Sequence, residues 1–210
     1  MLTTNSLEIE LTTKCTLGCP ACPRNNREDP KEGWDVGHLD TNIIKGFADI
    51  PSDRNYLFVG CYGDPIYHPD FIDIMRYYTD RNKRVTVHTN GSFKKQKWWD
   101  ELSSLNWSHK QEFTFSVDGL EDTNHLYRIR ADWESIMRGM KTMGNLPNDR
   151  KPRLLWKYLV FPYNEHQVEE ARQLANSLGF DRFLPVTSER DIQSYALGCD
   201  NPEIYEWKNK

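Results

Sequence analysis

The sequence lacks the features that would place this chain in a membrane or on a nucleic acid. No apolar run approaches the ~18 residues that a membrane-spanning helix needs. The start of the chain lacks the basic and then apolar pattern of a secretory signal peptide. Lysine and arginine total 27 against 31 acidic residues, which gives a net charge of −4 and no basic stripe. We therefore expect a cytoplasmic globular protein with neither a membrane nor a nucleic acid as its partner.

Cysteines are too few and too unevenly placed for a disulfide framework. The five are Cys15, Cys19, Cys22, Cys61 and Cys199. In a reducing compartment, the tight cluster of the first three is more typical of metal binding or redox chemistry than of disulfides. A structural zinc site would need a fourth ligand. The nearest candidates, His38 and Cys61, lie at no recognisable zinc spacing, so the cluster predicts a metal site with one open position.

Strand-like and helix-like segments alternate along the 210 residues, which suit a single domain. The expected strands are Leu7–Thr13, Asn55–Gly60, Arg84–Gly91, Glu112–Gly119, Arg153–Phe161 and Arg182–Val186. Apolar residues recur at helical spacing between several of them, for example Phe71, Ile74, Met75 and Tyr78. The expected helices are Asp40–Ile50, Phe71–Tyr78, Lys95–Leu105, Trp133–Met140 and Val168–Leu178. This order predicts parallel strands in either a doubly wound sheet or an incomplete (β/α) barrel. We expect a core barrel over residues 1–186 and a tail over 187–210 that packs on it, with one short helix near Ile192.

The cysteine cluster directly follows the first expected strand, so its loop belongs to the carboxyl edge of the sheet, where both architectures bind ligands. A C-x3-C-x2-C motif in this position resembles the radical S-adenosylmethionine (radical SAM) superfamily. The resemblance implies a partial (β/α)6 TIM-like barrel in which Cys15, Cys19 and Cys22 hold a [4Fe-4S] cluster. It also implies that SAM binds the open iron and is reductively cleaved to a 5′-deoxyadenosyl radical, which abstracts hydrogen from a substrate.

The second strand ends in Gly63-Asp64-Pro65, which is similar to the glycine-rich GGEP motif of that family. Aspartate replaces glutamate here, and Tyr62 replaces the first glycine. The resemblance implies that these three residues bind the SAM amino group, which a carboxylate suits. Taken alone, the same letters describe an ordinary Gly-Asp-Pro turn.

Two further strand ends resemble the family. Asn90 lies in a T-N-G turn after the third strand, which is also a common hairpin signal. Ser116 and Asp118 lie in an S-x-D-G motif after the fourth strand. Arg128 matches an arginine that peptide-modifying members place near the SAM carboxylate, and Arg130 is a competing candidate. The resemblance implies that these residues bind the cofactor.

Two positions leave alternatives open, and a third departs from the family pattern. Lys157, on the fifth strand, points into the lumen as a cofactor-binding residue or outward to solvent. Ala21 stands where many members have an aromatic residue, so adenine must pack elsewhere. Cys61 is either a small buried hydrophobe or, by analogy with radical SAM epimerases, a hydrogen-atom donor in catalysis.

The expected activity is therefore that of a minimal radical SAM enzyme with an unknown peptide or small-metabolite substrate. An electron donor such as flavodoxin or ferredoxin would supply the reducing electron. Two alternatives remain open. One is a non-enzymatic iron–sulfur or zinc-binding protein on a degenerate barrel, and the other is a SAM-binding regulator that never cleaves SAM.

Overall fold

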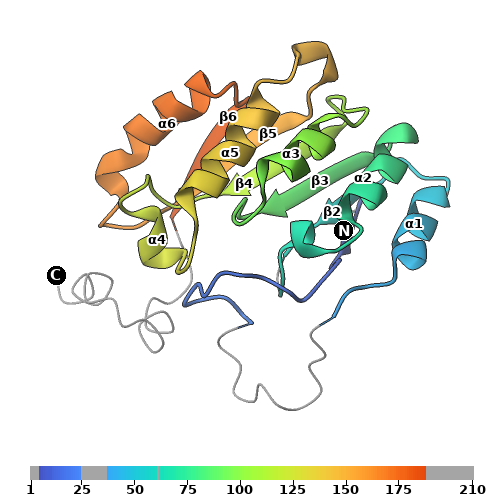
Figure 1. Cartoon of the computed structure of the whole chain (residues 1–210), viewed down its shortest axis with the longest axis horizontal. Helices are drawn as coiled ribbons and strands as arrows, with labels where there is room; N and C mark the ends of the chain where they lie inside the picture. The colour runs from blue at the N-terminus through green and yellow to red at the C-terminus, as the bar shows by residue number, and fades with distance from the viewer. Residues whose placement is uncertain (1–4, 25–36, 61, 188–210) are drawn as a thin grey trace.

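The computed structural model describes residues 5–24, 37–60 and 62–187, and within them six parallel strands form one sheet (Figure 1). The strands are β1 (Ser6–Ile9), β2 (Asn55–Phe58), β3 (Arg84–Thr89), β4 (Gln111–Ser116), β5 (Arg153–Val160) and β6 (Arg182–Thr187). Their spatial order is the order of the sequence, β1 to β6. In a doubly wound sheet, the spatial order of the strands would reverse at one point, although all strands stay parallel. The sequential order therefore confirms the partial (β/α)6 barrel and removes the doubly wound alternative.

Helices follow the strands and cover one face of the sheet (Figure 1). The α-helices are α1 (Thr41–Asp49), α2 (Phe71–Asp80), α3 (Gln96–Ser103), α4 (Asn124–Tyr127), α5 (Trp133–Gly144) and α6 (Val168–Ser177). Single 3₁₀ turns occur at η1 (Pro65–Tyr67), η2 (Asn148–Arg150) and η3 (Glu165–Gln167). No helix within the described ranges is long and apolar enough to cross a bilayer.

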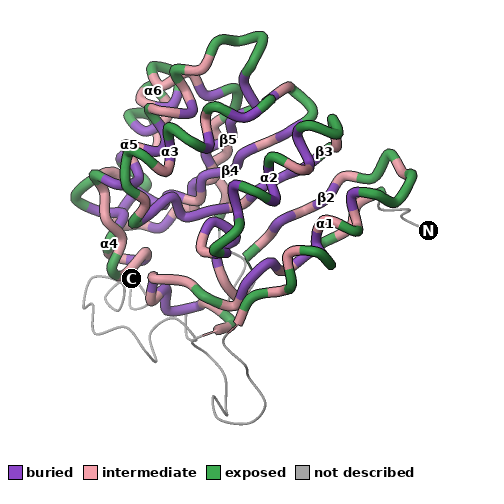
Figure 2. The backbone as a smooth tube through the Cα atoms, turned by 45° about the vertical axis from the view of Figure 1, so that its right-hand side comes forward, coloured by how far each residue is buried: buried purple, intermediate pink, exposed green. Residues whose placement is uncertain are grey.

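Buried residues gather between the sheet and these helices (Figure 2). This core is rich in aromatic side chains. Trp99 of α3 is fully buried and stacks on Phe115 of β4, with ring centroids 5.8 Å apart. A Cβ atom at Gly139 of α5 would lie 2.4 Å from the Trp99 ring. Glycine at this position lets α5 approach α3 closely enough to cover the tryptophan.

The opposite, inner face of the sheet is more polar, because side chains alternate along each strand. In β3, Val85 and Val87 are fully buried in the core, and Thr86 and His88 occupy the other face. In β5, Trp156 faces the core and Lys157 the inner side. This alternation gives the barrel an apolar outer layer and a polar lumen.

The six strands and five of the six helices lie where the sequence predicts them, with ends that differ by a few residues. The exception is α4, whose four residues are too few to show a helical period. The expected tail over residues 187–210, including the short helix near Ile192, lies outside the described residues apart from Thr187, which ends β6. The division at residue 186 stays a prediction.

Candidate active site

The loop after β1 carries the three clustered cysteines and lies at the carboxyl edge of the sheet. Cys15, Cys19 and Cys22 all line one cavity of about 610 Å³ at this edge, and none forms a disulfide. The Cys22 N–H donates to the Cys19 carbonyl at 3.1 Å, and the Gly18 N–H donates to the Ile129 carbonyl at 3.0 Å. The second bond fixes the cysteine loop to the segment that follows α4.

Hydrogen-bond donors point at the thiol sulfurs, as they do around iron–sulfur clusters. The Leu17 N–H lies 3.4 Å and the Asn90 Nδ2 3.5 Å from the Cys15 Sγ, and an Arg128 guanidinium nitrogen lies 3.9 Å from the Cys19 Sγ. Among the described residues, no three histidine, cysteine, aspartate or glutamate side chains converge as ligands of a single metal ion would. Cysteine thiolates are the ligands that iron–sulfur clusters take, and a structural zinc site would need a fourth ligand beside these three.

Burial controls the protonation of these thiols. It raises the pKa of Cys15 to about 12, and the nearby Asp64 charge acts in the same direction. Burial also raises the pKa of Cys19, against the opposing charge of Arg128. These two thiols therefore keep their protons at neutral pH until a metal displaces them, so metal loading releases protons.

Glycines let the loops after β1 and β2 cross in contact. A Cβ atom at Gly63 would lie 2.0 Å from the carbonyl oxygen of Thr12, and one at Gly60 would lie 1.9 Å from the carbonyl oxygen of Gly63. The Asp64 N–H donates to the Lys14 carbonyl at 2.9 Å just beside this crossing. Gly63 is therefore required because main chain passes where any side chain would stand.

Asp64 is buried in the cavity wall, and its carboxylate accepts hydrogen bonds from neighbouring residues of the protein. The Thr89 hydroxyl donates to its carboxylate at 2.8 Å, and the main-chain N–H groups of Asn90 and Ile66 donate at 2.6 Å and 3.2 Å. Burial raises the pKa of Asp64 to about 6, although these hydrogen bonds oppose the rise. Asp64 thus joins the ends of β2 and β3, and the buried Pro65 after it begins η1.

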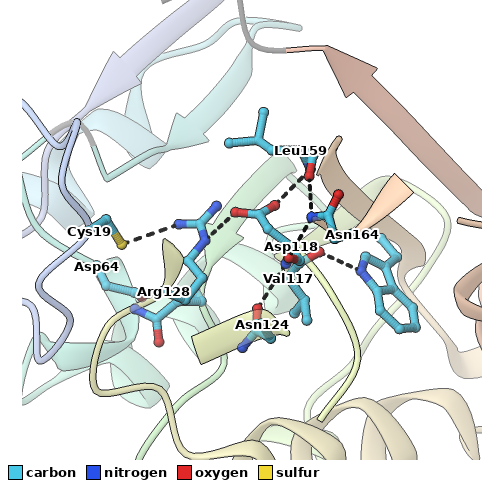
Figure 3. Close-up of polar contacts among 10 residues, drawn as sticks. Cys19, Asp64, Val117, Asp118, Asn124, Arg128, Leu159 and Asn164 are labelled. Atoms are coloured by element: carbon cyan, nitrogen blue, oxygen red, sulfur yellow. Dashed lines mark hydrogen bonds and ion pairs between the residues drawn. The ribbon is translucent and has the colours of Figure 1, made fainter. Parts of the chain in front are cut away.

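A second buried carboxylate, Asp118, holds Arg128 against the cysteine loop (Figure 3). The Arg128 Nε donates to the Asp118 Oδ2 at 2.5 Å, and the two side chains are 17% and 0% exposed. The other oxygen, Oδ1, accepts the Leu159 N–H at 2.8 Å, and the Asn164 side chain donates to the Asp118 carbonyl at 2.9 Å. A continuous chain of contacts therefore runs from β5 through Asp118 and Arg128 to the Cys19 sulfur.

Aromatic side chains from other segments pack beside the cysteine loop. The loop itself has Ala21 at the position where many members of the resembled family have an aromatic residue. Ala21 is buried in a small cluster with Tyr127 of α4 and Phe161 after β5. Phe161 packs on Tyr127 with ring centroids 5.0 Å apart and stacks on Tyr163 at 5.3 Å. Tyr127 also lines the cavity, so it offers the aromatic surface that the alanine cannot.

Most of the residues expected at the site meet at this cavity. Its walls include Cys15, Cys19, Cys22, Gly63, Asp64, Asn90, Ser116, Arg128 and Lys157. Pro65 and Asp118 stand behind these walls, and Cys61 lies outside the described residues. Arg130 is exposed, and its guanidinium would meet a side chain at Gly18, so Arg128 is the arginine that reaches the cavity.

Glu8, His88 and Tyr127 are among the lining residues that the motif comparison does not identify. Glu8 and His88 belong to strands whose apolar positions alternate with polar ones. The alternation itself could have identified them, because a charged or ionisable side chain at an inward position of a parallel strand needs a reason to be there.

A partial barrel of parallel strands with three free thiols around a cavity at its carboxyl edge defines a cofactor-dependent α/β protein. The particular family follows from the sequence match. The chain belongs to the radical SAM superfamily, whose family model matches residues 9–175. That family implies an iron–sulfur cluster and SAM as cofactors.

Curated relatives and solved structures agree with this assignment. An AdoMet-dependent heme synthase of Methanosarcina barkeri is 30% identical over 94% of this chain and 56% of its own length. A tungsten-containing aldehyde ferredoxin oxidoreductase cofactor-modifying protein of Pyrococcus furiosus is 25% identical over 88% of this chain and 53% of its own length.

Among solved structures, SuiB of Streptococcus suis bound to its precursor peptide SuiA superposes with a TM-score of 0.70 at 13% identity. The match covers 97% of this chain and 45% of SuiB. SuiB bound to S-adenosylmethionine gives 0.67 at 16% identity, over 97% of this chain and 46% of SuiB. At these identities the likeness is one of fold. The chain spans about half the length of the curated relatives it matches.

Proposed function

We propose that this chain binds a [4Fe-4S] cluster through Cys15, Cys19 and Cys22 and reductively cleaves SAM beside it. The observation that carries the proposal is the cavity at the carboxyl edge of the barrel. Three free thiols, two of which have sulfurs that accept hydrogen bonds, line this cavity together with the strand-end motifs. Three thiolates leave one iron of such a cluster open to a further ligand.

The bound cofactors would supply the difficult chemistry. Together they would supply the one-electron cleavage of SAM and the abstraction of a hydrogen atom from the substrate, with methionine and 5′-deoxyadenosine as products. The electron would come from a donor such as flavodoxin or ferredoxin.

The chain's own residues position these groups. Asn90 donates toward the Cys15 Sγ, and Arg128 donates toward the Cys19 Sγ. Asp118 holds Arg128 in place through its ion pair. Asp64, with Gly63, Pro65 and Ser116, forms or supports the SAM side of the cavity. The Asp64 carboxylate already accepts three donors, so we assign to it the shaping of the loop as well as attraction for the SAM amino group.

Anaerobic reconstitution tests the proposal. We expect iron and sulfide to give a brown protein whose reduced cluster has an electron paramagnetic resonance signal that SAM perturbs, and which releases 5′-deoxyadenosine under reduction. Tight zinc binding without a cluster would instead support the non-enzymatic alternative. SAM binding without 5′-deoxyadenosine would support the regulator.

The ligand assignment has its own test. Changing Cys15, Cys19 and Cys22 together to alanine should abolish cluster binding and leave the far-ultraviolet circular dichroism of the barrel unchanged. Retention of four irons per chain in this triple variant would refute the assignment.

The role of Cys61 stays a prediction with a clear test. If Cys61 donates a hydrogen atom to the substrate radical, Cys61→Ala should still form 5′-deoxyadenosine but should stop deuterium from heavy water entering the product. Normal labelling in the alanine variant would exclude the donor role.

The residues named above bind the cluster and SAM, and they do not select one class of substrate. The related heme synthase and cofactor-modifying protein act, by their names, on small cofactors, and SuiB binds a precursor peptide. We propose that this chain also modifies a small metabolite or a peptide that enters the barrel lumen.

A further inference from the structure

The inner face of the barrel carries an ionisable group on each of three alternate strands below the cysteine loop. Glu8 on β1, His88 on β3 and Lys157 on β5 all line the cavity. Lys157 pairs with Ser116, and His88 pairs with Thr114, two residues earlier on β4. Because residues two apart share a face of a strand, His88 and Lys157 both project into the lumen.

Lys157 lies deeper in the lumen than the cysteine loop. Leu159, the next inward residue of β5, packs against the small apolar cluster that contains the loop residues Leu17 and Cys19. Two residues along a strand span about 6.6 Å. Lys157 is therefore one side-chain layer below the loop that would hold the cluster, on the side from which a substrate in the lumen would approach it.

Lys157 and His88 also lack hydrogen-bonding and ion-pair partners in the part of the chain that the structure describes. Across the described residues, neither side chain makes a hydrogen bond or an ion pair, although both are half-buried. Two other buried charges of the cavity are satisfied: Arg128 pairs with Asp118, and Asp64 accepts three hydrogen bonds. A half-buried cation and imidazole without partners are what an incoming anion would satisfy.

Electrostatics indicates which anion fits. Burial lowers the pKa of His88, the Lys157 charge lowers it further, and the Glu8 charge opposes both. His88 is then neutral at neutral pH and offers one N–H, and Lys157 offers one positive charge. This set matches a singly charged carboxylate. A doubly charged phosphate would keep an uncompensated negative charge near Glu8.

We propose that Lys157 and His88 form a carboxylate-binding site in the lumen, so that the substrate of the proposed reaction carries a carboxylate held below the cluster. This inference rests on the proposed function for its meaning as a substrate site. It assigns Lys157 to the substrate rather than to the cofactor.

Binding of a small carboxylate tests the site without SAM and without turnover. The reconstituted protein, labelled with ¹³C at histidine and kept oxidised, is titrated with propionate and with the neutral isostere propionamide. The ring signal of His88 is assigned by its loss in His88→Gln. We expect a saturable shift of this signal with propionate and none with propionamide.

Lysine variants locate the charge that binds propionate. Lys157→Met should weaken propionate binding at least tenfold. Lys110→Met, an exposed lysine just before β4 at the opposite end of the barrel, should not change it. Equal shifts with both ligands, no shift at all, or unchanged propionate binding in Lys157→Met would each overturn the proposal.

The dissociation constant of SAM separates a substrate role from a cofactor role. It should change less than threefold in Lys157→Met, and a tenfold increase would return the lysine to the cofactor and overturn the proposal. Absence of 5′-deoxyadenosine from the unmodified protein would refute the proposed function instead, because the propionate titration involves no SAM.

Discussion

Replacing Asp118 by asparagine removes one charge from a buried ion pair and almost none of its volume. The Asp118 side chain is fully buried and accepts from Arg128 through Oδ2 and from the Leu159 N–H through Oδ1. An asparagine amide has one oxygen and one NH₂ group, so it can accept from only one of these donors. In either orientation, the NH₂ group faces a donor.

The expected cost follows from this geometry. Removing one partner of a buried pair typically destabilises a protein by about 3–5 kcal/mol, because the other charge stays buried and uncompensated. Arg128 is 17% exposed, so water relieves part of this penalty and we expect the lower end, about 3 kcal/mol. For a chain of this size, that corresponds to a fall of about 6–12 °C in melting temperature.

A double-mutant cycle measures the pair itself. The unfolding free energy is determined for Asp118→Asn, Arg128→Met and the double variant, with Arg130→Met as the matched control for an exposed arginine nearby. We expect the double variant to be less destabilised than the sum of the single variants, by at least 1 kcal/mol. A cost below 1 kcal/mol for Asp118→Asn, or strict additivity, would refute the idea that the pair organises the cysteine loop.

Three further changes test the loop ends, and a fourth, in α1, is a control. Gly63→Ala should abolish cluster loading, because its Cβ would meet main chain at 2.0 Å. Gly46→Ala is the control: it has open space around it and should raise the melting temperature slightly in a thermal unfolding assay. The pKa of Asp64 is raised to about 6, so the folded state holds this proton more tightly than the unfolded chain does. Stability from this group is complete below about pH 4 and is lost as pH rises through 6, so Asp64→Asn should flatten that part of a pH–stability curve. Asn90→Ala removes a donor to the Cys15 sulfur and should lower the cluster potential by about 40 mV in a redox titration, for a hydrogen bond worth about 1 kcal/mol; an unchanged potential would contradict this role.

The strands could be predicted because their alternation is strong and local. In β4, Phe113 and Phe115 face the core, and Thr114 and Ser116 take the other face, as a period of two requires. The strand ends were predicted two or three residues too long in several cases. Main-chain pairing stops at Thr89 and Ser116, where the chain turns into the loops that form the site.

The side-chain roles could be predicted only in part, because they depend on contacts between distant segments. A Gly-Asp-Pro sequence does not reveal that the Asp64 carboxylate receives the Thr89 hydroxyl and the Asn90 N–H, 25 and 26 residues away. The same holds for Asp118, whose partners lie on α4 and β5. Motif resemblance identified both carboxylates, and only the structure separates their share in holding the loops from any contact with a ligand.

The polar inner face links the fold to its function. Parallel strands in closed barrels and doubly wound sheets are usually buried on both sides and read as continuous apolar runs. Here the outer positions are apolar and buried. The inner positions include His88 and Lys157, to which the described residues offer no hydrogen bond or ion pair. Placing half-buried polar groups without partners costs stability. These polar groups lie on the face of the sheet that opens into the cavity. We infer that bound ligands, rather than the described part of the chain, offset the stability that these groups cost.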